Sequence, residues 1–350
     1  MADPTKDSSY AGAVEHYLSP RRKDAVKRFW EEPATRRLLT RAVATMGRSG
    51  QPRVLDVGCG AGDGLALLLS LPEAQQWRVS SGVLRYVGLD LNEELIDVAS
   101  TLYADLPGAE FLMGDIRTTE LPDEPFDIYL STGVPYSHLT KDELEEVLAS
   151  IFDSARRHST RSVVVVDVLG RYSIEWVDNW HSERWPYRMS FFQSDADSGF
   201  TDMSFYSAES LSRVISKAAT SAGCSVPRIE FADRSIMVGR HTATTEYDDR
   251  LPPYRKLVND LYNDTIDVPI EELRFAVELD KDAPPQILEF FDSFSSTWNT
   301  LLDNTIALKD LPSASVAQPM LADGLRHLEA NLQSGLGVGH SLTALAYVQP

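Results

Sequence analysis

One glycine-rich segment constrains the fold of this chain more than any other part of its sequence. Residues 54–64 read VLDVGCGAGDG, so a short apolar run leads directly into four glycines at alternate positions. Alternate glycines let a backbone turn tightly and approach a ligand closely, and the helix that follows offers free N–H groups. The spacing differs from the G-x-G-x-x-G of a dinucleotide loop, and an acid, Asp56, precedes the glycines. Such an acid suits a cationic ligand better than a pyrophosphate; the alternative is a purely structural glycine turn.

Apolar runs and amphipathic segments alternate through the middle of the chain. We expect strands at 52–57, 86–90, 109–113, 126–130, 162–168 and 228–239, and helices at 65–71, 93–102, 141–156 and 207–222. Thr140 and Ser207 are the expected N-caps of the last two helices. The alternation predicts βαβ units and a mostly parallel sheet, and the valine run 163–166 predicts a strand that is buried on both faces.

The segments before and after this alternating region are expected to be mainly helical. Residues 11–46 carry a helical stripe that Pro20 and Pro33 are expected to divide into pieces. Helical patterns return between 241 and 337, at 254–262, 270–279 and 285–302, and the chain closes on a strand at 342–348. The segment 311–318 is the best linker candidate. We therefore divide the chain into a helical cap (1–50), a core (51–240), a helical insertion (241–337) and a last core strand (338–350).

The loop DVGCGAG resembles the first motif of the class I (Rossmann-like) methyltransferases, which depend on S-adenosyl-L-methionine (SAM), and within them the small-molecule type. The resemblance covers roughly 52–239 and the final strand. It implies an α/β fold with a Rossmann-like, mostly parallel seven-stranded sheet and helices on both faces. The N-terminal cap and the large helical insertion before the last strand would be additions to that fold. It also implies SAM as cofactor and S-adenosyl-L-homocysteine as product.

The same resemblance implies a set of cofactor contacts. Asp90 would accept hydrogen bonds from both ribose hydroxyls, unless it caps the helix that starts at Asn92. Asp115 would pair with the adenine amino group, unless it only forms a turn. The spacing from Asp56 to Asp90 is longer than the family's usual spacing, which places extra residues in 71–84. The full set of expected cofactor residues is Asp56, Gly58, Cys59, Gly60, Gly62, Asp90, Leu91, Asn92, Gly114, Asp115, Ile116, Ser131, Thr132, Gly133 and Tyr17.

Acceptor residues are expected beyond the carboxyl ends of the strands, where ligands of parallel sheets lie. Methyl transfer needs a nucleophile held in line with the sulfur–methyl bond, and sometimes a group that removes its proton. Tyr136 and His138 are the candidates for orientation or proton removal, with a plain surface loop as the alternative.

An aromatic cluster with acids follows the fifth strand, and its substrate-binding candidates are Tyr172, Glu175, Trp176 and Trp180. Aromatic faces beside carboxylates suit a cation such as an amine or a guanidinium. The alternative is a loop whose tryptophans only cover the sheet. Tyr17 lies in a segment expected to close over SAM, with an amphipathic core helix as the alternative.

The composition argues against several classes of partner and site. The formal net charge of −19 argues against nucleic acid. Cys59 and Cys224 are far apart, so neither a disulfide framework nor a metal site is expected. No apolar run is long enough to cross a membrane and no signal peptide is visible, so we expect a cytoplasmic protein. The insertion, with its stripe Phe290, Phe291, Phe294 and Trp298, is expected to be a substrate lid or a homodimer interface; a self-contained core is the alternative.

The leading functional hypothesis is methylation of a small molecule in specialised metabolism, at the nitrogen of an amino or guanidino compound. C-methylation of an aromatic, indole-like or keto-acid substrate is second and O-methylation is third. An RNA or protein methyltransferase and a non-catalytic SAM-binding module are the remaining alternatives.

Overall fold

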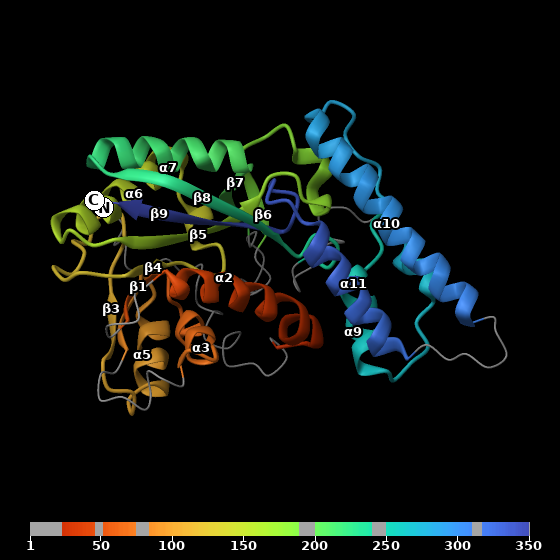
Figure 1. Cartoon of the computed structure of the whole chain (residues 1–350), viewed down its shortest axis with the longest axis horizontal. Coiled ribbons are helices and arrows are strands. Elements are labelled where there is room, and N and C mark those ends of the chain that lie inside the picture. Colours follow the sequence, from red (N-terminus) through yellow and green to blue (C-terminus); the bar gives the residue numbers. More distant parts are fainter. Residues whose placement is uncertain are drawn as a thin grey trace.

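The computed structural model describes residues 23–45, 52–74, 84–188, 200–239, 250–309 and 317–349. A single twisted sheet runs through the larger part of the molecule, and a group of helices lies beyond one end of it (Figure 1). No helix in these ranges is long and apolar enough to span a bilayer.

Seven strands form the body of the sheet, in the order β3-β2-β1-β4-β5-β9-β8. Their bounds are Arg53–Val57 (β1), Arg85–Asp90 (β2), Ala109–Met113 (β3), Ile128–Leu130 (β4), Ser162–Gly170 (β5), Ser225–Arg234 (β8) and Ser341–Gln349 (β9). The first five are parallel, whereas β9 runs antiparallel between β5 and β8. Every residue of β5 is buried, as the valine run predicted. The mostly parallel α/β sheet is thus confirmed.

Helices cover both faces of this sheet (Figure 1). The helices α6 (Lys141–Arg157) and α7 (Ala208–Ala222) pack on one face, and α2 (Glu32–Ala44) and α3 (Asp63–Leu69) pack on the other. The helix α5 (Glu93–Leu102) contacts β2 and β3. The predicted caps are confirmed, because Thr140 and Ser207 each form a capping box at the start of α6 and α7.

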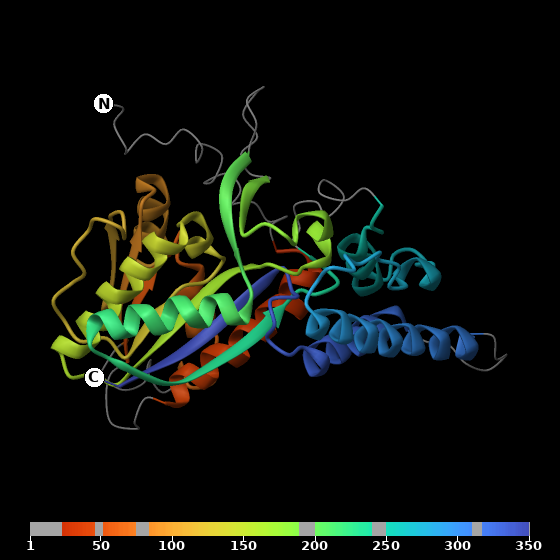
Figure 2. The ribbon, with the colours of Figure 1, turned by 90° about the horizontal axis from the view of Figure 1, so that it is seen from above.

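A hairpin that the sequence did not reveal extends the sheet beyond β5. Its strands are β6 (Arg184–Arg188) and β7 (Phe200–Tyr206), and β7 continues parallel to the last two residues of β5. Figure 2 shows the hairpin rising away from the plane of the main sheet. Trp185 and Tyr187 of β6 are buried, and the ring of Trp185 stacks on that of Phe205 in β7 with 4.3 Å between centroids.

The N-terminal helix corrects one expectation. It is continuous through Pro33, since a π-helical turn at Lys27–Glu31 (η3) leads directly into α2. Pro33 lies in the first turn of α2, where the shifted π-type pairing removes the need for its missing N–H. Pro20 lies outside the described residues.

The C-terminal block contains α9 (Tyr254–Asn263), η6 (Ile270–Leu273), α10 (Pro285–Lys309) and α11 (Gln318–Leu332). The helix expected at 270–279 is wrong beyond Leu273, because tertiary bonds hold the next residues in an extended path. The guanidinium of Arg274 pairs with Glu271 and Asp303, and Asn299 accepts a hydrogen bond from the Phe275 N–H. The strand expected at 228–239 also ends early, at Arg234, because Ser235 takes a left-handed conformation with φ of 60°.

The block shares one apolar core with the loop after β5 and with the start of the N-terminal helix. The rings of Phe291 and Trp180 stack with 5.8 Å between centroids, and Trp298 is fully buried. A self-contained satellite core is therefore the wrong description of this aromatic stripe.

Candidate cofactor site and its surroundings

The glycine loop lies where β1 ends and α3 begins, between the loop after β4 and the end of α5. Gly58 and Gly62 have φ of 71° and 87°, a region that side chains other than glycine rarely adopt. A Cβ on Gly58 would lie 2.5 Å from the Pro135 side chain, and one on Gly62 would lie 2.5 Å from the Tyr103 ring. Tyr103 also donates a hydrogen bond of 3.0 Å to the Gly62 carbonyl. The loop is thus held from both sides, and only glycine fits at these two positions.

Asp56 is buried at the end of β1 beneath the loop. Tyr86 donates a hydrogen bond of 2.6 Å to Oδ2, while Oδ1 has no partner among the residues that the structure describes. Burial raises the pKa of Asp56 to about 7, and the Tyr86 bond acts in the opposite direction. A Cβ on Gly64 would collide with this carboxylate. A buried acid with one oxygen that lacks a partner in the described part of the chain fits a cationic ligand group.

Asp90 ends β2 and faces the same loop. Its Oδ2 accepts a hydrogen bond of 2.8 Å from the Gly60 N–H, and its Oδ1 accepts one of 2.9 Å from the Asn92 N–H. The cap of α5 is Asn92, whose side chain accepts from the Leu95 N–H, so the capping alternative for Asp90 is wrong. Each oxygen of Asp90 retains acceptor capacity for a hydroxyl. Two further residues expected to contact the cofactor differ in exposure, since Cys59 is buried and Leu91 is exposed.

Asp115 follows β3 and forms an ion pair with Arg117, two residues further along the chain. The Arg117 guanidinium binds both carboxylate oxygens, and the Arg117 N–H donates 3.0 Å to Oδ1. This hydrogen bonding holds the pKa of Asp115 below its usual value. The arrangement is the turn that we gave as the alternative, and the adenine contact of Gly114, Asp115 and Ile116 stays a prediction.

The loop after β4 is buried and strained. Ser131 is fully buried with no partner for its hydroxyl among the described residues, and the exposed Gly133 follows Thr132. Val134 has a φ of 64°, which is a genuine outlier for a β-branched residue. Asp167 of β5 holds this loop by accepting hydrogen bonds from the N–H groups of Gly133 and Val134 at 2.8 and 3.3 Å.

The two catalytic candidates lie on the short 3-10 turn Pro135–His138. Tyr136 is buried, and its hydroxyl has no hydrogen-bond partner in the described part of the chain. Burial and then the charge of Asp56 raise its pKa far above the usual value. His138 is half-buried at the end of the turn. The structure therefore brings Tyr136 close to Asp56, a proximity that the sequence could not show.

The aromatic cluster after β5 is packed rather than open. Trp176 donates its indole N–H to the carbonyls of Gly170 and Arg171, and Trp180 donates to the carbonyl of Ser173 at 2.8 Å. Both rings and the nearby Tyr172 are buried. This arrangement matches the alternative of tryptophans that cover the sheet. Binding of the acceptor by these residues stays a prediction.

The buried Glu175 of this cluster pairs with His340, a residue that sequence reasoning missed. His340 precedes β9, and because β9 is antiparallel its first residue lies at the edge where the parallel strands end. The Gly170 N–H donates a hydrogen bond of 3.1 Å to the His340 carbonyl. A histidine just before a final strand is the only signal that could have indicated it. Tyr17 lies outside the described residues.

One family model and one curated relative match parts of this chain. A family model described as a methyltransferase domain matches residues 54–158. A fatty-acid O-methyltransferase from Mycolicibacterium smegmatis is 38% identical over 87 residues, which are 25% of this chain and 27% of that protein. The match thus spans only about a quarter of the relative's length.

Two solved structures are distant likenesses. A SAM-dependent methyltransferase from Mesorhizobium loti is 15% identical with a TM-score of 0.38, and the match covers 55% of this chain and 82% of that one. Another, from Clostridium acetobutylicum, is 12% identical with a TM-score of 0.42, covering 64% and 90%.

Residues 54–158 therefore form a methyltransferase domain, with SAM as its cofactor.

Proposed function

We propose that this protein is a methyltransferase that transfers a methyl group from SAM to a small molecule, with the nitrogen of an amino or guanidino compound as the favoured acceptor. One observation carries the proposal. The ends of the neighbouring strands β1 and β4 bring together three buried polar atoms without partners among the described residues: Asp56 Oδ1, Ser131 Oγ and Tyr136 Oη. Buried polar atoms are nearly always hydrogen-bonded, so this group is suited to a polar ligand.

The residues at this edge would hold SAM as follows. Asp90 would accept from the ribose hydroxyls, since its carboxylate is already oriented by two backbone N–H groups. Asp56 would face the positively charged end of the cofactor, because its free oxygen is buried next to the glycine loop. When bound, SAM supplies an activated methyl group. The buried, strained Val134 would help to exclude water from that end.

Tyr136 is the proposed group that orients the acceptor, since burial keeps its hydroxyl protonated, and His138 is the proposed group that takes the acceptor's proton. An ammonium acceptor must lose a proton before its nitrogen can attack, whereas a carboxylate acceptor needs no base. The chain's net charge of −19 also favours a cationic acceptor over an anionic one. O-methylation of a carboxylic acid is the second candidate, because the matched relative is named for that activity.

Calorimetric titration with SAM, followed by incubation with a panel and mass spectrometry, tests the proposal. The panel contains amines, guanidines, indoles, keto acids and fatty acids. A mass gain of one methyl on an amine or guanidine, reduced in Asp90→Ala at a limiting SAM concentration, is the expected result. Methylation of a fatty acid would favour the second candidate, and SAM binding without any transfer would favour a non-catalytic SAM-binding module.

A further inference from the structure

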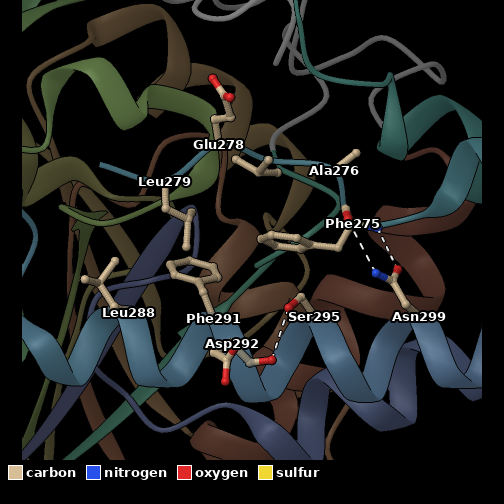
Figure 3. Close-up of a pocket in the computed structure, with 10 residues that line it drawn as sticks. Phe275, Ala276, Glu278, Leu279, Leu288, Phe291, Asp292, Ser295 and Asn299 are labelled. Carbon is tan, nitrogen blue, oxygen red and sulfur yellow. Dashed lines mark hydrogen bonds between the residues drawn. The ribbon is translucent and has the colours of Figure 1, made fainter. Parts of the chain in front are cut away.

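An open pocket of about 540 Å³ lies in the C-terminal helical block, away from the cofactor loops. It is formed between the extended segment 275–279 and the N-terminal half of α10 (Figure 3). Its walls are mainly apolar and aromatic: Phe275, Val277, Leu279, Leu288 and Phe291. A volume of this size is in the range of pockets that hold small organic molecules.

The walls of the pocket are fixed by hydrogen bonds rather than being loose. Asn299 on α10 accepts from the Phe275 N–H at 2.9 Å, and the Tyr254 hydroxyl accepts from the Ala276 N–H at 3.3 Å. On the floor, Phe291 stacks on Trp180, which anchors the pocket to the loop after β5. Because the segment is held along its backbone, its side chains remain available to line a cavity.

Two carboxylates at opposite rims decide which ligand fits. Glu278 stands on the extended segment and Asp292 on α10, with the apolar side chains between them (Figure 3). Both are exposed, and neither has an ion pair within the described ranges. Nearby acids behave differently, since Glu271 and Asp303 both pair with Arg274.

The other polar side chains that line the pocket already form hydrogen bonds within the protein. The Ser295 hydroxyl donates to the carbonyl of Asp292, and Asn299 is bound to the backbone of Phe275. None of the ten lining residues is a lysine, arginine or histidine. Charge and hydrogen-bonding capacity therefore both call for a ligand that donates rather than accepts.

We propose that this pocket binds a small organic cation, an amine or guanidine carrying an apolar or aromatic body, at a site separate from the cofactor. The body would lie on Phe275, Leu279 and Leu288, and the cationic head would reach Glu278 or Asp292. None of the residues expected to bind the cofactor lines the pocket. The inference therefore stands whether or not the protein transfers methyl groups.

Three probes of matched shape test the proposal: 4-phenylbutylamine, 4-phenylbutanol and 4-phenylbutyrate. Their dissociation constants are measured by ligand-observed NMR at low salt on the full chain, alone and with excess S-adenosylhomocysteine. The amine should bind up to about fivefold more tightly than the alcohol, since an exposed charge pair contributes about 0.2–1 kcal/mol, and the butyrate should bind most weakly. The preference should shrink at high salt.

Variants locate the binding. Glu278→Gln with Asp292→Asn should remove the preference for the amine while leaving alcohol binding unchanged, and Glu289→Gln, on the same helix but outside the pocket, should change nothing. Ser295→Phe should fill the pocket and abolish binding of all three probes. Asp90→Ala should leave probe binding intact even where it weakens SAM. Equal affinity for the three probes, no binding of the amine, or an unchanged preference in the Glu278/Asp292 variant would overturn the proposal.

Discussion

Two regions of the molecule differ in whether their buried polar groups have partners. One is the cofactor edge of the sheet, and the other is the junction between the N-terminal helix and the C-terminal helices. At the cofactor edge, Asp56, Ser131 and Tyr136 keep buried atoms without partners among the described residues. At the junction, buried polar groups have partners. The side chain of Arg255 binds Asp24 and Glu31, and both oxygens of Glu329 accept hydrogen bonds. An unmet group costs stability and is retained where a ligand uses it, whereas a matched group fixes one region against another.

The junction also reaches the cofactor edge through a second arginine. Arg234 of β8 donates to Thr35 of α2 at 2.9 Å and to Asp167 of β5 at 3.0 Å. Asp167 in turn holds the N–H groups of Gly133 and Val134. The junction thus helps to hold the strained loop after β4 at the cofactor edge.

The largest expected effect comes from Arg255→Ala. The variant leaves Glu31 buried with its main partner removed, so the free energy of unfolding should fall by about 3–5 kcal/mol. Urea denaturation measures this change. Lys256→Ala is the matched control on the same helix, because its exposed pair with Asp260 is worth about 0.3–0.5 kcal/mol.

Acidification should reproduce part of this loss. Burial acts to raise the pKa of Glu31, yet the charges of Arg255, Lys27 and Arg234 hold it well below the usual value. A lowered folded-state pKa means stability that is present above the unfolded pKa and is lost as the pH falls through the folded pKa. If Arg255→Ala were no more costly than Lys256→Ala, the junction would not be the supporting element described here.

The second effect concerns Asp90 and SAM. Asp90→Ala removes the proposed acceptor for both ribose hydroxyls and frees the Gly60 N–H, so SAM should bind about 1–3 kcal/mol more weakly. Calorimetric titration measures the affinity, and Asp97→Asn on the exposed face of α5 serves as the control. Unchanged SAM affinity in a folded Asp90→Ala protein would contradict the role of Asp90.

The third effect separates function from stability at Asp56. Its pKa is raised by burial to about 7, so the folded cofactor-free protein holds a proton that the unfolded chain loses near pH 4. Stability of the cofactor-free protein should therefore fall as the pH rises from about 4 to 7, and Asp56→Asn should flatten that slope. At pH 8 the variant should be about 1–2 kcal/mol more stable than the parent, and it should bind SAM less well. Thermal unfolding across pH gives the first quantity and titration gives the second. Loss of both stability and SAM affinity would mean that Asp56 is structural.

The parts of the molecule that the sequence revealed are those governed by local rules. The glycine loop and the helix at Glu93–Leu102 depend on backbone conformation and periodicity over a few residues, and they were predicted closely. The pairing of Tyr86 with Asp56 and of Glu175 with His340 depends on strand register and on the reversal of β9. Such contacts join residues far apart in the chain, and a single sequence contains no signal for them.

The helix predicted beyond Leu273 failed for a related reason. Its local pattern was helical, but Arg274 and Phe275 gain tertiary bonds to α10 that outweigh a weak propensity. The continuity of the N-terminal helix through Pro33 likewise depends on a π turn that propensity does not encode.

The smallest expected effect is the sharpest test of the contrast between the two regions. Tyr136→Phe removes a buried hydroxyl that has no partner among the described residues, so stability of the cofactor-free protein should stay constant or rise by up to about 1 kcal/mol. Tyr86→Phe removes a hydroxyl of the same chemistry that donates to Asp56, and it should destabilise the protein by about 1–3 kcal/mol. Thermal unfolding compares the two variants directly. If methyl transfer to the acceptor found by the panel falls in Tyr136→Phe while stability and SAM affinity hold, the unmet hydroxyl is kept for the reaction. Equal destabilisation by both variants would show that Tyr136 is satisfied in the cofactor-free protein and that the cofactor edge is no different from the junction.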